Sequence, residues 1–277
     1  MSDAVVGLYP ELLSVGGIQT VSRHTAAVIS LFAAERGWRT HLLSLNDPEG
    51  FHETVVGGTS IKFRGFGREK LRFAFAALRF ARRDTQFVLA AHPNLAVPAH
   101  SMQTASRGLR VIVMSHGVEV WKPLSVIRRA SLRAADCALA PSRYTAEKLR
   151  NEQKVAGDRV RILHWGLDPD FLAVAATAEK LPLPDSIPRT RYVLAVGRWS
   201  SAERYKGFDT LIQALPQLRR VLHDVQTEDF GRPGGRLELC PEYADEGGLA
   251  SPVLPDERED AAGRHRKAHR IKGPLPL

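Results

Sequence analysis

Two cationic residues, Arg198 and Lys206, lie at positions in the sequence that are suited to binding an anion. Arg198 follows the apolar run YVLAVG at residues 192–197, which predicts a strand, and Lys206 precedes an amphipathic helix expected from Gly207 to about Leu222. Free backbone N–H groups and the helix dipole favour negative charge at a helix amino terminus. A guanidinium fork matches two phosphate oxygens and an ammonium adds a mobile charge, so the pair predicts a diphosphate site. The alternative is two solvated cations on a loop.

A glycine pair, Gly16 and Gly17, lies between the apolar run AVVGLY at residues 4–9 and a helix predicted over residues 18–36. Glycine lets the backbone approach a ligand closely, and the first turn of the helix offers N–H groups to a phosphate. An ordinary loop is the alternative, because the pattern is short. The turn does not contain GxGxxG, which argues against a nicotinamide-dependent dehydrogenase.

A third candidate, His116, ends the apolar run RVIVMSH and precedes Gly117 and Glu119. A histidine at the carboxyl end of a strand can donate a hydrogen bond to a sugar hydroxyl or stabilise charge near a reacting carbon. A structural histidine that caps the following turn is the alternative. Glu119 is expected to be a solvated loop carboxylate.

A parallel sheet is expected to position these residues. Short apolar runs alternate with helical patterns, and this order predicts a parallel sheet covered on both faces. Gly16, Gly17, His116 and Arg198 all follow strands, at the edge where such sheets bind ligands. The predicted strands are residues 4–9, 38–45, 86–92, 109–116, 136–141 and 159–165, and the predicted helices are residues 18–36, 69–82, 95–106, 124–134 and 142–151.

Composition divides the chain into four segments. Residues 1–173 form a first domain, residues 174–190 contain three prolines and read as a linker, and residues 191–226 begin a second domain. The tail at residues 227–277 has six prolines and seven glycines without a sustained period. We expect this tail to be mostly disordered.

Composition also limits the class of protein. The 277 residues are 44% hydrophobic, which is enough for one large core or two modest ones. No leader peptide and no long apolar span is apparent, so we expect a cytoplasmic protein. Two cysteines cannot supply a disulfide framework or a zinc site of paired cysteines. The net charge of +9 is concentrated before residue 227, because residues 1–226 contain 31 Lys/Arg and 20 Asp/Glu. Such a surface attracts phosphates of nucleotide sugars, lipids or nucleic acid.

Sequence motifs that resemble those of a known family indicate which of these phosphate compounds the chain binds. The stretch YVLAVGRWSSAERYKGFDTLIQAL, read with VGGIQTVSRHTA near the amino end, resembles the donor-binding elements of family-4 retaining glycosyltransferases of the GT-B fold. PSRYTAEKL and HWGLDPDF are also typical of that family, and the resemblance covers about residues 5–226. It implies an α/β fold of GT-B type, with a complete Rossmann-like N-terminal domain on the acceptor side and the start of a second, nucleotide-sugar-binding domain.

The resemblance also implies a reaction. A sugar would move from a nucleotide-diphosphate donor to an acceptor hydroxyl with retention at the anomeric carbon. Gly16, Gly17, Arg198 and Lys206 would bind the donor diphosphate, and His116 would be the catalytic residue in the cleft. Fixed cations that stabilise the departing diphosphate make a metal unnecessary, so we expect no cofactor and no metal.

The resemblance ends soon after Gln226. The family carries, in its second domain, two glutamates separated by seven residues beside Gly-Phe-Gly, and these contact the donor sugar and ribose. The tail contains no Gly-Phe-Gly sequence and no strand-loop-helix pattern to position its glutamates. We therefore expect a truncation or frameshift near Gln226 and little or no activity of this chain. Trp165 stands where the family has asparagine, which leaves Asp168 only a role in the turn.

The partners implied are a nucleotide sugar and a polysaccharide, lipid-linked or small-molecule acceptor. Residues 69–83, EKLRFAFAALRFARR, combine aromatic side chains with four arginines and a lysine, so they could lie on the inner face of an anionic membrane as a peripheral contact. In the alternative, the aromatic side packs on the sheet and the arginines face water. A non-catalytic α/β module that binds an acceptor or an anionic lipid is the second hypothesis for function. Nucleic acid is not an expected partner, because basicity alone supports it.

Overall fold

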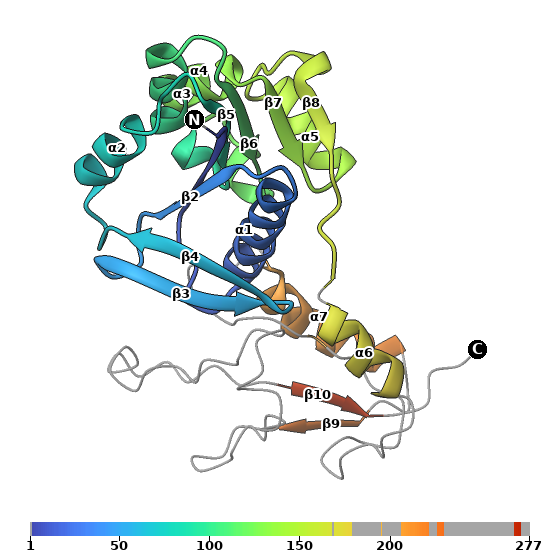
Figure 1. Cartoon of the computed structure of the whole chain (residues 1–277). Coiled ribbons are helices and arrows are strands. Elements are labelled where there is room, and N and C mark those ends of the chain that lie inside the picture. The colour runs from blue at the N-terminus through green and yellow to red at the C-terminus, as the bar shows by residue number, and fades with distance from the viewer. Residues whose placement is uncertain are drawn as a thin grey trace. The chain divides into compact units, whose positions relative to one another are not determined.

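The computed structural model describes residues 2–167, 169–178, 195, 206–221, 226–229 and 269–272. The chain divides into two compact units, Met1–Leu172 and Ala173–Leu277. The elements of both units are labelled in Figure 1.

The first unit is built on an eight-stranded sheet with the order β3-β4-β2-β1-β5-β6-β7-β8. Neighbouring strands are parallel except β3 and β4, which are antiparallel. The predicted Rossmann-like α/β domain is confirmed. The strands are β1 (Ala4–Tyr9), β2 (Arg39–Ser44), β3 (Gly50–Val56), β4 (Thr59–Gly65), β5 (Thr85–Ala90), β6 (Arg110–Met114), β7 (Cys137–Ala140) and β8 (Val160–Ile162).

Helices connect the parallel strands, as parallel pairing requires. Each of the five helices predicted in this part of the chain is present, although α2 ends four residues earlier than expected. The helices are α1 (Gly17–Glu35), α2 (Lys70–Leu78), α3 (Ala96–Ala105), α4 (Val126–Ala134) and α5 (Arg143–Asn151), with short 3₁₀ turns η1 (Pro93–Leu95), η2 (Val118–Val120) and η3 (Gly157–Arg159).

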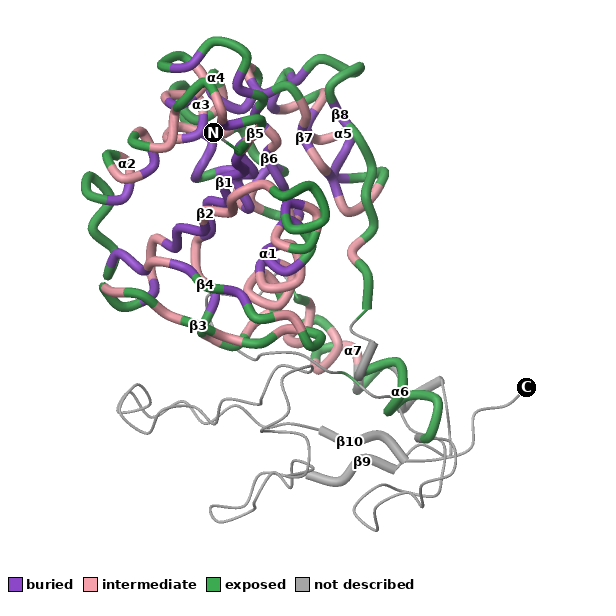
Figure 2. The backbone as a smooth tube through the Cα atoms, viewed as in Figure 1, coloured by how far each residue is buried: buried purple, intermediate pink, exposed green. Residues whose placement is uncertain are grey.

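The core lies on both faces of the sheet. On one face, α2, α3, α4 and α5 bury apolar side chains such as Phe73, Met102 and Leu132, and on the other face α1 packs against Tyr9 and Phe63. Every residue of β1 is buried (Figure 2), which explains why its sequence is a continuous apolar run.

The β3–β4 hairpin was not among the predicted elements. Gly57 and Gly58 form its tight turn with φ of 52° and 77°, a conformation that glycine adopts at little cost. Along β4 the side chains alternate, so that Ile61 and Phe63 are buried while Lys62 is exposed. The alternation and the Gly-Gly pair in FHETVVGGTSIKF were the available signals.

The strand order fixes where a ligand can bind. β1 lies between β2 and β5. The connection from β1 therefore leads to β2 on one side of β1, and a later connection leads to β5 on its other side. Ligands of such sheets bind beyond the carboxyl ends of the strands at this reversal. The loops after β1, β5 and β6 meet this description.

The second unit is described only in part. Helix α6 (Pro169–Ala178) spans the boundary between the units, α7 (Phe208–Val221) confirms the helix predicted after Lys206, and the strands β9 (Gln226–Asp229) and β10 (His269–Lys272) form an antiparallel pair. Of the strand predicted at residues 192–197, only Ala195 is described. The residues from 179 to 194 and most of the tail lie outside the described residues. Within the part that is described, no helix has the length and apolar character to cross a membrane.

Candidate active site

The loop between β1 and α1 is held by a buried carboxylate and an arginine. Asp47 is only 1% exposed, and its two oxygens accept the backbone N–H groups of Leu12 at 2.7 Å and Leu13 at 3.1 Å. From α1, Arg23 donates to the carbonyl oxygens of Leu12 at 3.0 Å and Ser14 at 2.9 Å. These bonds from both sides fix the path of the chain that leads to Gly16.

Gly17 opens α1 without crowding from the protein. A Cβ placed there would meet nothing within 4 Å, whereas a Cβ on Gly16 would meet only the end of the Gln19 side chain. No side chain caps the helix, and its first turn has no acidic residue. The first N–H groups of a helix have no partner inside it, and the dipole adds partial positive charge. Because packing does not explain a glycine at position 17, this end of α1 can receive an anion at close range.

The loop after β6 is shaped by a glycine and a glutamate. Gly117 has φ of 149°, a conformation that other residues rarely adopt. Glu119 accepts the backbone N–H groups of His116 and, at 3.1 Å, of Gly117. The expectation of a solvated Glu119 is therefore wrong, because its carboxylate satisfies two backbone donors that the turn leaves without strand partners.

A second histidine, His92, completes the site. It follows β5, the strand beside β6, and its ring stacks on that of His116 with 5.9 Å between centroids and 25° between planes. The ring Nε2 of His116 lies 2.7 Å from the carbonyl oxygen of Ala91. Both rings are half-buried at the carboxyl edge of the sheet. Sequence reasoning singled out only His116, although His92 ends the predicted strand QFVLAAH in the same way.

The hydrogen bonds assign a tautomer to each neutral ring. A carbonyl oxygen can only accept, so Nε2 of His116 carries the hydrogen and Nδ1 keeps a lone pair. In His92, Nδ1 accepts the backbone N–H of Asn94 at 3.1 Å, so Nε2 carries the hydrogen. The pair thus offers one donor and one acceptor nitrogen, the complement of a sugar hydroxyl, which both donates and accepts.

Burial keeps the two rings neutral. Loss of solvation lowers the pKa of His92 to about 4, against a smaller opposing effect of the Glu119 carboxylate. The pKa of His116 is also lowered by burial, while its bond to Ala91 and the charge of Glu119 oppose the shift. At neutral pH the two rings are therefore polar and uncharged.

Trp165 packs beside the histidine pair. It lies three residues after β8, and its ring centroid is 5.7 Å from that of His116. The indole also packs against the core on the α1 face of the sheet. Ser142 caps α5, because its Oγ accepts the N–H of Thr145 at 3.2 Å.

The other predicted site residues lie in the second unit or outside the described residues. Lys206 is exposed and, with Gly207 at φ of 79°, immediately precedes α7 in the second unit. Arg198 and Asp168 lie outside the described residues. The described residues contain no group of three or more His, Cys, Asp or Glu side chains that could hold a metal ion. The structure thus assembles Gly16, Gly17 and His116 along one edge, while the roles of Arg198 and Lys206 stay predictions.

Fold and sequence together define a protein of the GT-B type. A model of Glycosyltransferase Family 4 matches residues 15–171, which is more than half of the chain. The chain belongs to this glycosyltransferase family. A search of curated proteins finds no match.

Solved structures also resemble the chain, among them the following two. A glycosyltransferase from Rickettsia africae ESF-5 is 13% identical over 79% of this chain and 58% of its own, with a TM-score of 0.50. HepE from Anabaena, in complex with UDP-glucose, is 12% identical over 77% of this chain and 57% of its own, with a TM-score of 0.42. The chain therefore spans less than two thirds of the length of these proteins.

Proposed function

We propose that the chain is a retaining hexosyltransferase that moves a sugar from a nucleotide-diphosphate donor to the hydroxyl of a polysaccharide, lipid-linked or small-molecule acceptor. The observation that carries the proposal is the carboxyl edge of the first unit. There, in a family-4 chain, an uncapped helix with an open glycine follows β1, and a neutral histidine pair follows the neighbouring strands β5 and β6. Retention is proposed on the resemblance to retaining enzymes alone.

In this proposal the first unit binds both charged and neutral parts of the donor. The diphosphate lies against the N–H groups at Gly16 and Gly17, and the histidine pair holds a sugar hydroxyl through His92 Nε2–H and His116 Nδ1. The bond from the anomeric carbon to the phosphate oxygen breaks as the acceptor oxygen forms the new bond, and the proton of the acceptor hydroxyl passes to the departing diphosphate. Negative charge then grows on the diphosphate, so fixed donors act more strongly on the transition state than on the bound donor.

The second unit supplies the remaining positive charge. Arg198 and Lys206 are proposed to contact the departing diphosphate, which makes a metal ion or another cofactor unnecessary. The sequence after Gln226 lacks the Gly-Phe-Gly sequence that accompanies the paired glutamates of the resembled enzymes. We therefore propose that this chain binds a nucleoside diphosphate and shows little or no turnover of the donor.

Isothermal titration with a panel of nucleoside diphosphates tests the proposal. We expect binding that weakens about tenfold or more in Gly17→Val, Arg198→Ala and Lys206→Ala, since each change removes close approach or a charge-assisted contact worth about 1.5–3 kcal/mol. Arg107→Ala, an exposed arginine of the first unit, is the matched control and should bind like the unmodified chain. Absence of binding to every nucleotide would refute donor recognition. Acceptor binding without nucleotide binding would instead support the non-catalytic module.

A further inference from the structure

A face of the first unit that carries both apolar and basic side chains has no covering element among the described residues. It consists of the outer side of α2 and the adjoining side of the β3–β4 hairpin. We define this α2–β3 surface by six residues: Phe51, Arg64, Leu71, Arg72, Phe75 and Arg79.

Helix α2 divides its apolar side chains between two environments. Phe73 is 2% exposed and packs on the sheet with Ala77. This agrees with the alternative for residues 69–83, in which the aromatic side of the helix packs on the sheet. Leu71 and Phe75, however, are 75% and 67% exposed. They are four residues apart and so lie one above the other on the outer side of the helix. Packing on the sheet therefore does not explain Leu71 and Phe75.

The hairpin continues this face. Phe51 and Arg64 are opposite each other in the antiparallel pair, so both point to the same side of the sheet. The Arg64 guanidinium lies 5.7 Å from the Phe51 ring and 5.2 Å from the Phe66 ring, and Phe66 packs edge-on against Phe73 of α2. Phe51 is 85% exposed. The hairpin and the helix are thus joined through packed side chains into one surface.

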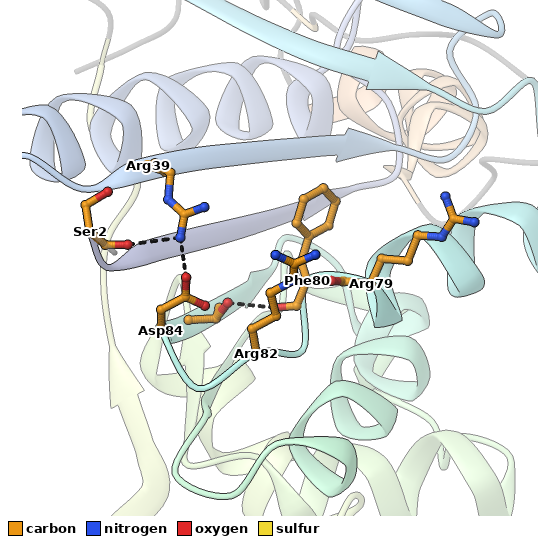
Figure 3. Close-up of polar contacts among 7 residues, drawn as sticks. Ser2, Arg39, Arg79, Phe80, Arg82 and Asp84 are labelled. Atoms are coloured by element: carbon orange, nitrogen blue, oxygen red, sulfur yellow. Dashed lines mark hydrogen bonds and ion pairs between the residues drawn. The ribbon is translucent and has the colours of Figure 1, made fainter.

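Basic residues surround the exposed apolar ones. Residues 49–83 contain eight Lys/Arg and three Asp/Glu, a net of +5, which is more than half of the charge of the whole chain. Arg72 binds Glu49 bidentately at 2.9 and 2.5 Å. Arg39 of β2 is turned toward Ser2 and Asp84, whereas Arg79, at the carboxyl end of α2, extends away from that cluster (Figure 3). The Arg79 guanidinium makes no hydrogen bond or ion pair within the described part of the chain.

We propose that the α2–β3 surface docks on a bilayer that contains anionic lipid. Leu71, Phe75 and Phe51 would enter the boundary between headgroups and acyl chains, and the arginines would bind lipid phosphates. A bilayer with anionic lipid uses both the apolar side chains and the arginines of this surface. A nucleic acid would use the charge but leave the three apolar side chains in water. Binding of an acidic protein instead of a bilayer is a different outcome of the test.

Co-sedimentation of the full chain with vesicles tests the proposal. We expect it to pellet with vesicles of phosphatidylcholine and phosphatidylglycerol at low salt, and much less with phosphatidylcholine alone or at raised salt. Arg64→Gln with Arg79→Gln should weaken binding about 25-fold, because each basic residue near an anionic surface contributes about fivefold. Leu71→Ser with Phe75→Ser should weaken it about tenfold or more through lost apolar burial.

Matched controls lie elsewhere on the first unit. Val28→Ser with Leu31→Ser removes exposed apolar residues of α1, and Arg107→Gln with Arg110→Gln removes two exposed charges. Both pairs should bind vesicles like the unmodified chain. Circular dichroism melting checks that every variant is folded.

Four outcomes would overturn the proposal: no pelleting with anionic vesicles at low salt, equal pelleting with both lipid compositions, equal losses in the controls, or a complex with itself or an acidic protein that depends on Leu71 and Phe75 without vesicle binding. The proposal does not rest on sugar transfer. Vesicle binding and nucleotide titration are separate measurements, so either can fail while the other succeeds.

Discussion

Acidification should destabilise the first unit through His92, and replacing this residue should remove that effect. The neutral ring is favoured in the folded chain, because burial lowers the pKa of His92 to about 4 from the usual 6.5. The folded state therefore binds fewer protons than the unfolded state between these two pH values. The resulting stability is complete above pH 6.5 and is lost progressively as the pH falls toward 4.

The size of the effect follows from the difference between the two pKa values. A difference of about 2.5 pH units corresponds to about 3 kcal/mol once both states are fully protonated. At pH 5 the unfolded state is almost fully protonated at this site and the folded state is mostly neutral, so about 2 kcal/mol is already lost. His116 shifts in the same direction and adds to the loss.

His92→Asn is the variant that isolates this effect. Asparagine cannot titrate here, and its side-chain oxygen can still accept the N–H of Asn94, as the His92 ring does. Urea unfolding at pH 8 and pH 5, followed by tryptophan fluorescence, should show that the unmodified chain loses about 2 kcal/mol more than the variant. Trp165 lies against His116 and reports on this edge of the sheet.

His100→Asn, a change in α3 outside the histidine pair, should keep the pH dependence of the unmodified chain. Proton NMR of the His92 ring should find it neutral well below pH 6. A ring that titrates near pH 6.5, or equal pH dependence in the unmodified chain and His92→Asn, would refute the reasoning from burial.

Three further substitutions test the loops of the site. Gly117→Ala should lower the free energy of unfolding by about 1–3 kcal/mol, because φ of 149° strains any residue with a Cβ, and thermal denaturation measures it; an unchanged midpoint would contradict this. Asp47→Ala should cost about 3 kcal/mol in urea unfolding, since it leaves the buried N–H of Leu12 and the Ser44 hydroxyl without their acceptor; a loss below about 1 kcal/mol would show that the loop does not depend on this carboxylate. Gly17→Val should change stability by less than about 1 kcal/mol, because the position is open, yet it should weaken nucleoside diphosphate binding in titration; equal affinity would remove Gly17 from the proposed site.

Much of the first unit could be predicted because its local and tertiary signals agree. A strand such as β1, buried on both faces, can only be a continuous apolar run, and the connecting helices show one apolar side each. The β3–β4 hairpin was not predicted, because its strands are covered on one face only. Phe51 and Val55 are exposed, so its apolar residues do not form the runs that identify buried strands, and alternation was the signal to follow.

The candidate site could be predicted only where a residue's position in the chain decides its role. Gly16, Gly17 and His116 follow strands, and this is visible without a structure. The pairing of His92 with His116 depends on β5 and β6 being neighbours, and strand order is set by tertiary packing rather than by any local pattern. Glu119 shows the same limit. Its carboxylate accepts two backbone N–H groups in the turn at Gly117, and exposure inferred from residue type could not anticipate a partner that the backbone itself creates.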